Sequence, residues 1–185
     1  GPHGEPDRYL ALDVLQAGLA ALAPAPRDAG RLALIVCRMP DGSRTTPASV
    51  RVTPQDGVHG DGWSRRPPRN VEAQVTVVRR DVAELVANGQ PLTHFGDNLF
   101  VDLDIADANL PAGSRVRIGD ALLEVTAKPH NGCLKYKDRF GEDALRFVQA
   151  PGTRDRNLRG LHWKVIEAGT LHVGARIDVV SRPGG

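Results

Sequence analysis

The sequence predicts a mainly β protein: a closed or nearly closed β-barrel with an N-terminal helix and short interspersed helices. Beyond residue 30, short runs of β-branched and aliphatic residues follow one another, and Gly, Pro, Asp or Asn separates them. One segment with clear helical periodicity precedes these runs. A barrel is a common way for many short strands to bury their apolar faces without leaving exposed sheet edges.

The N-terminal helix is predicted over residues 7–22, where leucines and a valine recur at helical spacing. Asp7 is its expected N-cap, and Pro24 ends it. Residues 1–4 are interpreted as an expression scar, since Gly-Pro-His is typical of protease cleavage. We therefore expect a helix and linker over residues 5–30 and a barrel domain over residues 31–185.

Four strands are expected in the first half of the barrel. Residues 31–38 form an apolar run that ends at an Asp-Gly turn, and residues 50–53 lead into a glycine-rich loop. Residues 71–79 alternate apolar and polar side chains, which is typical of a half-buried strand. Residues 98–102 form the fourth run.

The second half predicts a hairpin and three closing strands. Residues 115–118 and 121–125 flank Gly119-Asp120, which suits a two-residue hairpin turn. Short helices are expected at residues 81–88, before Gly89, and within residues 134–150, centred on 142–149. The closing strands are expected at residues 163–166, 169–173 and 176–180.

Composition excludes several classes of protein. The 185 residues suit one domain, and a formal charge of +2 is too small for a nucleic-acid-binding protein. No apolar run approaches a membrane span, and no signal peptide is visible, so we expect a cytoplasmic protein without membrane partners. The two cysteines lie in different contexts, and Cys37 follows a buried-type run, which favours reduced thiols. No set of three or four metal ligands is present.

Cys133 is the strongest candidate for chemistry. Lys128, Lys135, Lys137 and Arg139 surround it, and such cations lower the pKa of a thiol and favour the reactive thiolate. The preceding Asn-Gly turn predicts that the thiol leaves a strand end. The alternative is a small apolar residue packed in the core.

Further candidates lie near Cys133 and on the glycine-rich loop. Lys135 would share the side of Cys133 if a strand continued, where it would hold a thiolate or a substrate anion; otherwise it is a solvated lysine. His59 and Asp61 suit a base or a metal-ligand pair beside flexible backbone. The alternative for Asp61 is a turn-forming carboxylate that accepts from a backbone amide.

Two dipeptides complete the candidate site. Arg69, with Asn70, is the preferred anion clamp, because a guanidinium fork suits phosphate or carboxylate groups. Asp97 and Asn98 follow a glycine, where their side chains either contact a ligand or satisfy local backbone groups. We expect five of these residues to converge near Cys133 on one face of the barrel: His59, Asp61, Arg69, Asp97 and Asn98.

The order of these phrases resembles the MOSC family, named for the C-terminal domain of molybdenum-cofactor sulfurases. The resemblance covers residues 51–180, and its specificity lies in the order and spacing of several weak phrases around one cysteine. The phrases are Gly57–Asp61, Arg69-Asn70, Gly96–Leu99, Leu110–Gly119, Leu122–Thr126, Cys133–Lys135 and residues 160–169.

The resemblance implies a β-rich barrel in which Cys133 acts as a nucleophilic thiolate or a persulfide carrier. It implies a sulfur transferase or an enzyme of carbon–sulfur chemistry, acting on a small anionic or sulfur-containing substrate with a sulfur-donor protein as partner. One alternative is a reductase component that binds a molybdenum-pterin cofactor through Cys133. Another is a carrier module without catalysis. The cofactor, the substrate and the oligomeric state stay open.

Overall fold

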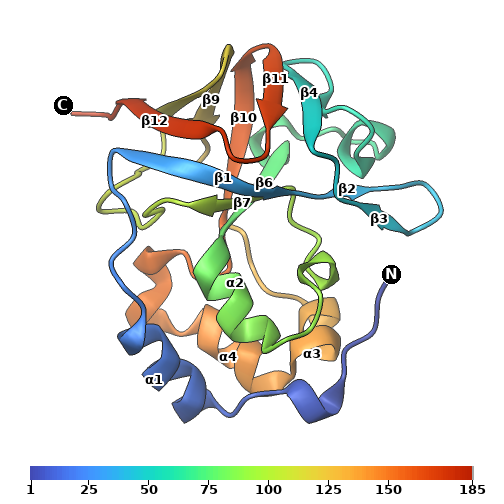
Figure 1. Ribbon diagram of the computed structural model, residues 1–185, viewed down its shortest axis with the longest axis vertical. Coiled ribbons are helices and arrows are strands. Elements are labelled where there is room, and N and C mark those ends of the chain that lie inside the picture. The colour runs from blue at the N-terminus through green and yellow to red at the C-terminus, as the bar shows by residue number, and fades with distance from the viewer. Residues whose placement is uncertain (185) are drawn as a thin grey trace.

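The computed structural model describes residues 1–184 and contains a closed barrel of seven strands (Figure 1). Its neighbouring strands are antiparallel except for one parallel pair, β6 and β7. The predicted fold class is confirmed. In spatial order the strands are β1 (Ala29–Ile35), β12 (Arg176–Ser181), β8 (Arg115–Ile118), β9 (Ala121–Val125), β10 (Leu161–Glu167), β6 (Val75–Arg79) and β7 (Leu99–Asp102).

Two smaller sheets and a layer of helices complete the molecule. The helices gather below the barrel in Figure 1 and cover the side formed by β6 and β7. The small sheets are β11 (Gly169–His172) with β4 (Ser49–Thr53) and β5 (Gly57–Val58), and β2 (Cys37–Arg38) with β3 (Arg44–Thr45). The α-helices are α1 (Leu12–Ala21), α2 (Arg80–Ala87), α3 (Leu134–Phe140) and α4 (Glu142–Gln149). Short 3₁₀ turns are η1 (Pro6–Arg8), η2 (Gly62–Arg65), η3 (Val71–Ala73), η4 (Leu92–His94) and η5 (Pro151–Arg156).

Strand alternation produces two hydrophobic cores. On β7, Leu99 and Val101 point into the barrel, whereas Phe100 between them packs under the helices. On β6, Val77 points into the barrel and Val78 packs under the helices. Because both faces of these strands are covered, they are nearly continuous apolar runs rather than half-polar ones.

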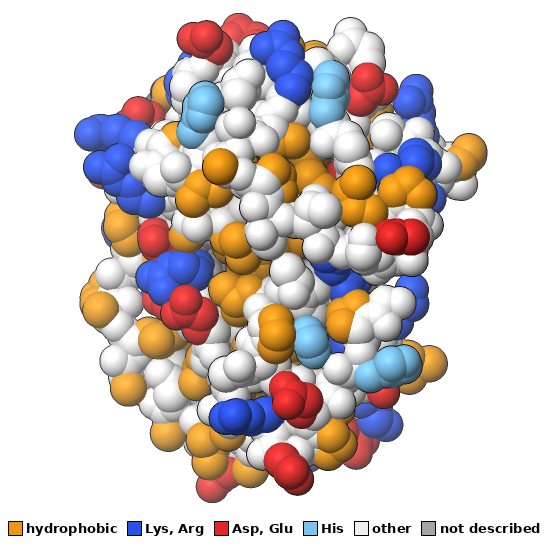
Figure 2. All heavy atoms as spheres, turned by 45° about the vertical axis from the view of Figure 1, so that its right-hand side comes forward, with side chains coloured by type: hydrophobic (Ala, Val, Ile, Leu, Met, Phe, Trp, Pro, Cys, Tyr) orange, Lys and Arg blue, Asp and Glu red, His pale blue; other side chains and the backbone are white. Residues whose placement is uncertain are grey.

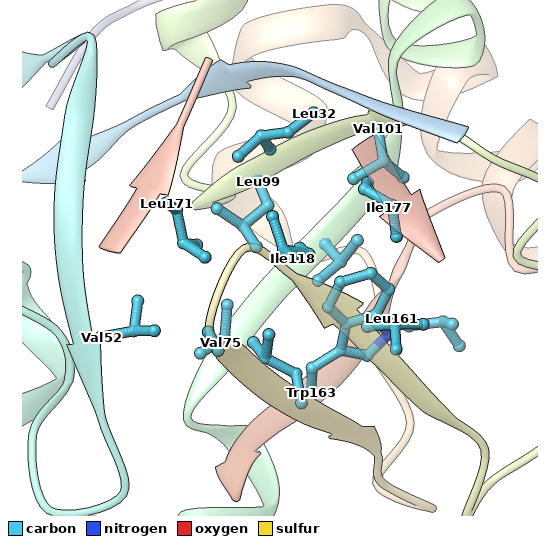
Figure 3. Close-up of a cluster of buried hydrophobic side chains, with 14 of the residues drawn as sticks. Leu32, Val52, Val75, Leu99, Val101, Ile118, Leu161, Trp163, Leu171 and Ile177 are labelled. Carbon is cyan, nitrogen blue, oxygen red and sulfur yellow. The ribbon is translucent and has the colours of Figure 1, made fainter. Parts of the chain in front are cut away.

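The barrel core is built around Trp163 of β10, which is fully buried (Figure 3). Leu99, Ile118 and Ile177 reach the same interior from three other strands. A buried aromatic ring removes a large apolar surface from water, so this cluster is a principal source of the barrel's stability.

Three predicted elements are corrected by the structure. The strand expected over residues 71–79 begins at Val75, because the Asn70 side chain accepts from the amide of Glu72 and starts the turn η3. The helix expected over residues 7–22 divides into η1 and α1. Cys133 does not end a strand: it is the N-cap residue of α3, so the strand argument for Lys135 was wrong.

Residues 127–160 are an insertion between two paired barrel strands. β9 and β10 are antiparallel neighbours, with Trp163 opposite Val125. The intervening chain forms α3, α4 and η5 and then returns to β10, which lies beside β9 in the barrel. The two ends of the insertion, which carry His130, Cys133 and Arg159, therefore lie on the same part of the barrel.

The surface carries charges of both signs. Figure 2 shows basic and acidic side chains interspersed over one face, in keeping with the formal charge of +2. Among residues 1–184, no helix has the length and apolar character needed to cross a bilayer. Gly185, the last residue of the barrel domain expected over residues 31–185, lies outside the described residues.

Asn98 joins three parts of the barrel through its buried amide. Its Oδ1 accepts from the amide and the hydroxyl of Thr76, both at 3.1 Å. Its Nδ2 donates to the carbonyl of Val36 at 3.1 Å. Asn98 is fully buried, so these groups have no access to water if the amide is lost. The side chain therefore has a structural function between β6 and the end of β1.

Replacing Asn98 with alanine is expected to lower the free energy of unfolding by about 2 kcal/mol or more, because buried polar partners are left unsatisfied. Urea unfolding followed by circular dichroism measures this. Asn131→Ala is the matched control, since Asn131 is exposed. Equal stability of the two variants would contradict the structural function of Asn98.

Candidate functional site

Cys133 is an exposed thiol at the start of α3. Its backbone is extended, and its carbonyl accepts from the amide of Lys137 at 3.1 Å. The residue before it, Gly132, packs against α4, where Gln149 donates to its carbonyl at 3.1 Å. A Cβ at Gly132 would lie 2.4 Å from Leu145 Cδ1, so glycine permits this close approach. The thiol is thus exposed but held on fixed backbone.

Cys133 lines a cavity of about 340 Å³, and most of the charged side chains in its lining are cationic. Asp138 is the one carboxylate in the lining that the structure describes. The cationic side chains come from four parts of the chain: Arg38 and Arg44 of the β2–β3 hairpin, Arg66, Lys135 and Arg139 of α3, and Arg159. The first three residues of the chain also lie along this cavity.

The arginines of the cavity repel one another. Burial, together with the charges of Arg139 and Arg38, lowers the pKa of Arg44 to about 10. Arg44 donates to the carbonyl of Thr93 at 3.0 Å, and its buried Nε has no partner among residues 1–184. An anion in the cavity would relieve this repulsion.

Asp97 holds the two ends of the insertion together. Arg159 Nη1 donates to both carboxylate oxygens, at 3.0 and 2.9 Å, and His130 Nε2 lies 3.0 Å from Oδ1. The carboxylate is only 1% exposed. Although burial opposes its charge, Arg159 and His130 hold the pKa of Asp97 well below its usual range. Asp97 is therefore a fixed anion that positions these two side chains.

Asp61 is a fixed anion that positions Arg38, as Asp97 positions Arg159 and His130. Its carboxylate accepts from the backbone amide of Arg38 at 2.8 Å, from Nε at 3.1 Å and from Nη2 at 2.7 Å. It also accepts from the amide of Trp63. Burial opposes its charge, but the Arg38 contacts keep the pKa of Asp61 below its usual range. A carboxylate bound in this way holds Arg38 against the cavity and is poorly suited to accept a proton.

The remaining candidates lie elsewhere. His59 contacts Thr53 Oγ1 at 3.2 Å and Asp56 at 3.7 Å, and Arg69 lies 3.7 Å from the same aspartate. Neither His59, Arg69 nor Asn70 is in the lining of the Cys133 cavity. The structure thus brings Cys133 and Lys135 into one cavity, with Asp61 and Asp97 holding its arginines.

Sequence reasoning missed the arginines that form the cavity. Arg38, Arg44 and Arg159 reach Cys133 from distant parts of the chain, so local charge near the cysteine gave no sign of them. One signal was available for Arg159, because it lies at the end of the insertion, two residues before β10 begins. Among residues 1–184, no group of three or more acidic, histidine or cysteine side chains could hold a metal ion.

The family model that matches this chain is the MOSC domain, over residues 60–178. The match covers more than half of the 185 residues. The chain belongs to the MOSC family. No curated protein matches it closely enough to count as a relative.

Solved structures share this fold at low sequence identity. YuaD from Bacillus subtilis is 16% identical with a TM-score of 0.62, and the alignment covers 84% of this chain and 98% of that one. YiiM from Geobacillus stearothermophilus is 17% identical with a TM-score of 0.56, covering 84% and 77%. YiiM from Escherichia coli is 20% identical with a TM-score of 0.54, covering 84% and 72%. These likenesses show that the chain shares its fold with these proteins.

The exposed Cys133 is expected to react with iodoacetamide at neutral pH, whereas Cys37 stays unmodified in the folded protein. Cys37 is buried, and burial together with Asp61 raises the pKa of its thiol to about 11. Peptide mass mapping over time measures both sites. Faster labelling of Cys37 would contradict the proposed exposure, and labelling in denaturant provides the control.

Acidification is expected to destabilise the fold between about pH 6.5 and about pH 4. Burial, with the neighbouring His130, lowers the pKa of His162 from 6.5 to about 4. As the pH falls, the unfolded state binds the proton before the folded state does, so the free energy of unfolding decreases. The loss from His162 is at most about 3 kcal/mol. His162→Gln should reduce the pH dependence of urea unfolding, and His172→Gln, at an exposed site, should leave it unchanged.

Proposed function

We propose that this MOSC protein transfers sulfur, with Cys133 as the nucleophilic thiolate that carries a persulfide. The observation that supports the proposal is the position of the thiol: Cys133 is exposed and lines an arginine-rich cavity. A sulfur carrier needs a thiol that a donor can reach, because exchange proceeds by thiolate attack on sulfur. Family membership agrees with sulfur- or molybdenum-cofactor-related chemistry.

The proposed step moves one sulfur atom without net oxidation. The Cys133 thiolate attacks the outer sulfur of a persulfide on a donor protein. A bond forms between Sγ and that sulfur, the donor's sulfur–sulfur bond breaks, and its electron pair leaves with the donor thiolate. Arg159 and Arg139, which line the same cavity as Cys133, would stabilise the anionic sulfur.

The cavity also indicates the substrate class. Its cationic lining favours a small anionic acceptor. The two free thiols fit the reducing cytoplasm that we expect for this protein. Lys135, which is exposed beside Cys133, would contribute charge rather than a fixed contact.

A molybdenum-pterin cofactor is the second candidate, and the residues present fit its chemistry. The arginines of the cavity lining suit the cofactor's phosphate, and the Cys133 thiolate suits a soft metal. When bound, the cofactor would supply two-electron redox chemistry. Cys133 would then be a ligand, and Arg38, Arg44 and Arg159 would orient the anionic end.

Incubation with glutathione persulfide is expected to add the mass of one sulfur atom at Cys133, and Cys133→Ser should abolish the addition. The serine hydroxyl cannot form a persulfide, and replacing an exposed side chain should leave the urea midpoint close to wild type. Intact and peptide mass spectrometry measure the addition.

Cys37→Ser is the matched control and should load normally. Sulfur added at Cys37, or none at Cys133, would contradict the persulfide function. Stoichiometric molybdenum in freshly purified protein would instead support the cofactor-binding alternative, and elemental analysis of the same sample measures it.

A further inference from the structure

His130 has one ring nitrogen bound and one free. Its Nε2 lies 3.0 Å from the buried carboxylate of Asp97. Its Nδ1 has no hydrogen-bond partner among residues 1–184. It is also not one of the solvent-inaccessible polar atoms in these residues that lack a partner. Because Asp97 is an anion and only accepts, Nε2 must carry the proton in this pair. The Nδ1 lone pair is therefore free to accept a proton.

The surroundings of His130 keep this ring neutral. Burial and the Arg159 charge lower the pKa of His130 below its usual range, against the opposing effect of Asp97. Arg38 acts in the same direction as Arg159, and the His162 ring packs alongside with its centroid 4.7 Å away. A neutral imidazole with a fixed tautomer is the arrangement that general-base chemistry requires.

A second cavity, of about 450 Å³, lies on the His130 side of the insertion. His130, Arg154 and Arg159 line it, together with apolar groups such as Val148 and Leu158. Arg159 lines both this cavity and the Cys133 cavity. Its buried Nε has no partner among the residues described, and its guanidinium lies over the Tyr136 ring, 4.9 Å from the centroid. The two cavities thus share one fixed cation.

We propose that the His130 cavity binds the sulfur acceptor, a small thiol that carries a fixed negative charge, and that His130 Nδ1 removes its thiol proton. This inference rests on the proposed sulfur-transfer function. Arg154 and Arg159 hold the anionic group, and Arg159 places the acceptor beside the thiol cavity. Asp97 is a positioning residue, since it acts through His130 and Arg159.

The chemistry balances without a further reactant. The acceptor's S–H bond breaks, its proton moves to Nδ1, and Asp97 stabilises the resulting imidazolium. The acceptor thiolate then attacks the outer sulfur of the Cys133 persulfide. A new sulfur–sulfur bond forms on the acceptor, the bond to Sγ breaks, and the electron pair returns to Cys133 as a thiolate. The imidazolium releases its proton to water. The acceptor thiol is oxidised to a persulfide as Cys133 is reduced to a thiol, so the two changes cancel and no further oxidant or reductant is needed.

Two thiols of similar size test the acceptor class. Protein loaded with sulfur at Cys133 is mixed with 2-mercaptoethanesulfonate or with neutral 2-mercaptoethanol, and loss of the added sulfur is followed by intact mass. We expect faster transfer to the sulfonate. His130→Gln keeps a donor toward Asp97 but provides no base, so it should slow transfer at least about tenfold while loading stays unchanged.

Arg154→Gln should remove the preference for the charged thiol, because Arg154 is an exposed side chain in the cavity lining. His172→Gln and Arg176→Gln, at exposed sites outside both cavities, are the matched controls and should behave as wild type. Equal rates for the two thiols, or a normal transfer rate in His130→Gln, would overturn the inference.

A second readout does not depend on the cysteine. Nitrogen-15 spectra of histidine-labelled Cys133→Ser protein should show His130 protonated at Nε2, and its signals should shift with the sulfonate thiol but not with the neutral one. A proton on Nδ1, or no shift, would overturn the inference even if Cys133 loads. Failure of loading would overturn the sulfur-transfer function, and these spectra would still decide whether the cavity binds an anionic thiol.

Discussion

The buried charge of Asp97 is the constraint on which the site depends. Its carboxylate is shielded from water and keeps its charge through Arg159 and His130. Removing either partner would leave a charge that costs several kcal/mol to bury. His130 lies near the start of the inserted segment and Arg159 lies near its end. One carboxylate therefore fixes both ends of residues 127–160. The same contacts set the wall that the two cavities share.

Two buried acids also determine the field around Cys133. Asp61 forms an ion pair with Arg38, and Asp97 forms one with Arg159. Arg44 and Arg139 contact backbone carbonyls of the η4 turn, at Thr93 and His94. Carbonyl groups hold a guanidinium in place without cancelling its charge. The cavity is consequently positive although the surface seen in Figure 2 is mixed and the net charge is small.

Local patterns predicted most of the fold and singled out Cys133 as the candidate for chemistry. The hairpin at Gly119 is confirmed, because its turn chemistry lies within the sequence that it joins. Cys133 stood out through its neighbours along the chain. Arg38 and Arg159 could not be found in that way, since the pairing of β9 with β10 and the position of Arg38 beside the Cys133 cavity are long-range outcomes of packing. Asp61 and Asp97 were singled out as candidate base and ligand-binding residues, but they hold arginines in place.

Glycines near both ends of the insertion allow its backbone to pack closely enough to fix the positions of Cys133 and Arg159. Gly160 has a φ of 120°, and a Cβ there would lie 2.3 Å from the carbonyl oxygen of Val77. Gly132 fits against α4 with similar closeness. Each glycine directly adjoins a residue of the site, Arg159 or Cys133. Backbone packed against the barrel and against α4 therefore sets where the cation and the thiol lie, and both are held in position before any ligand enters.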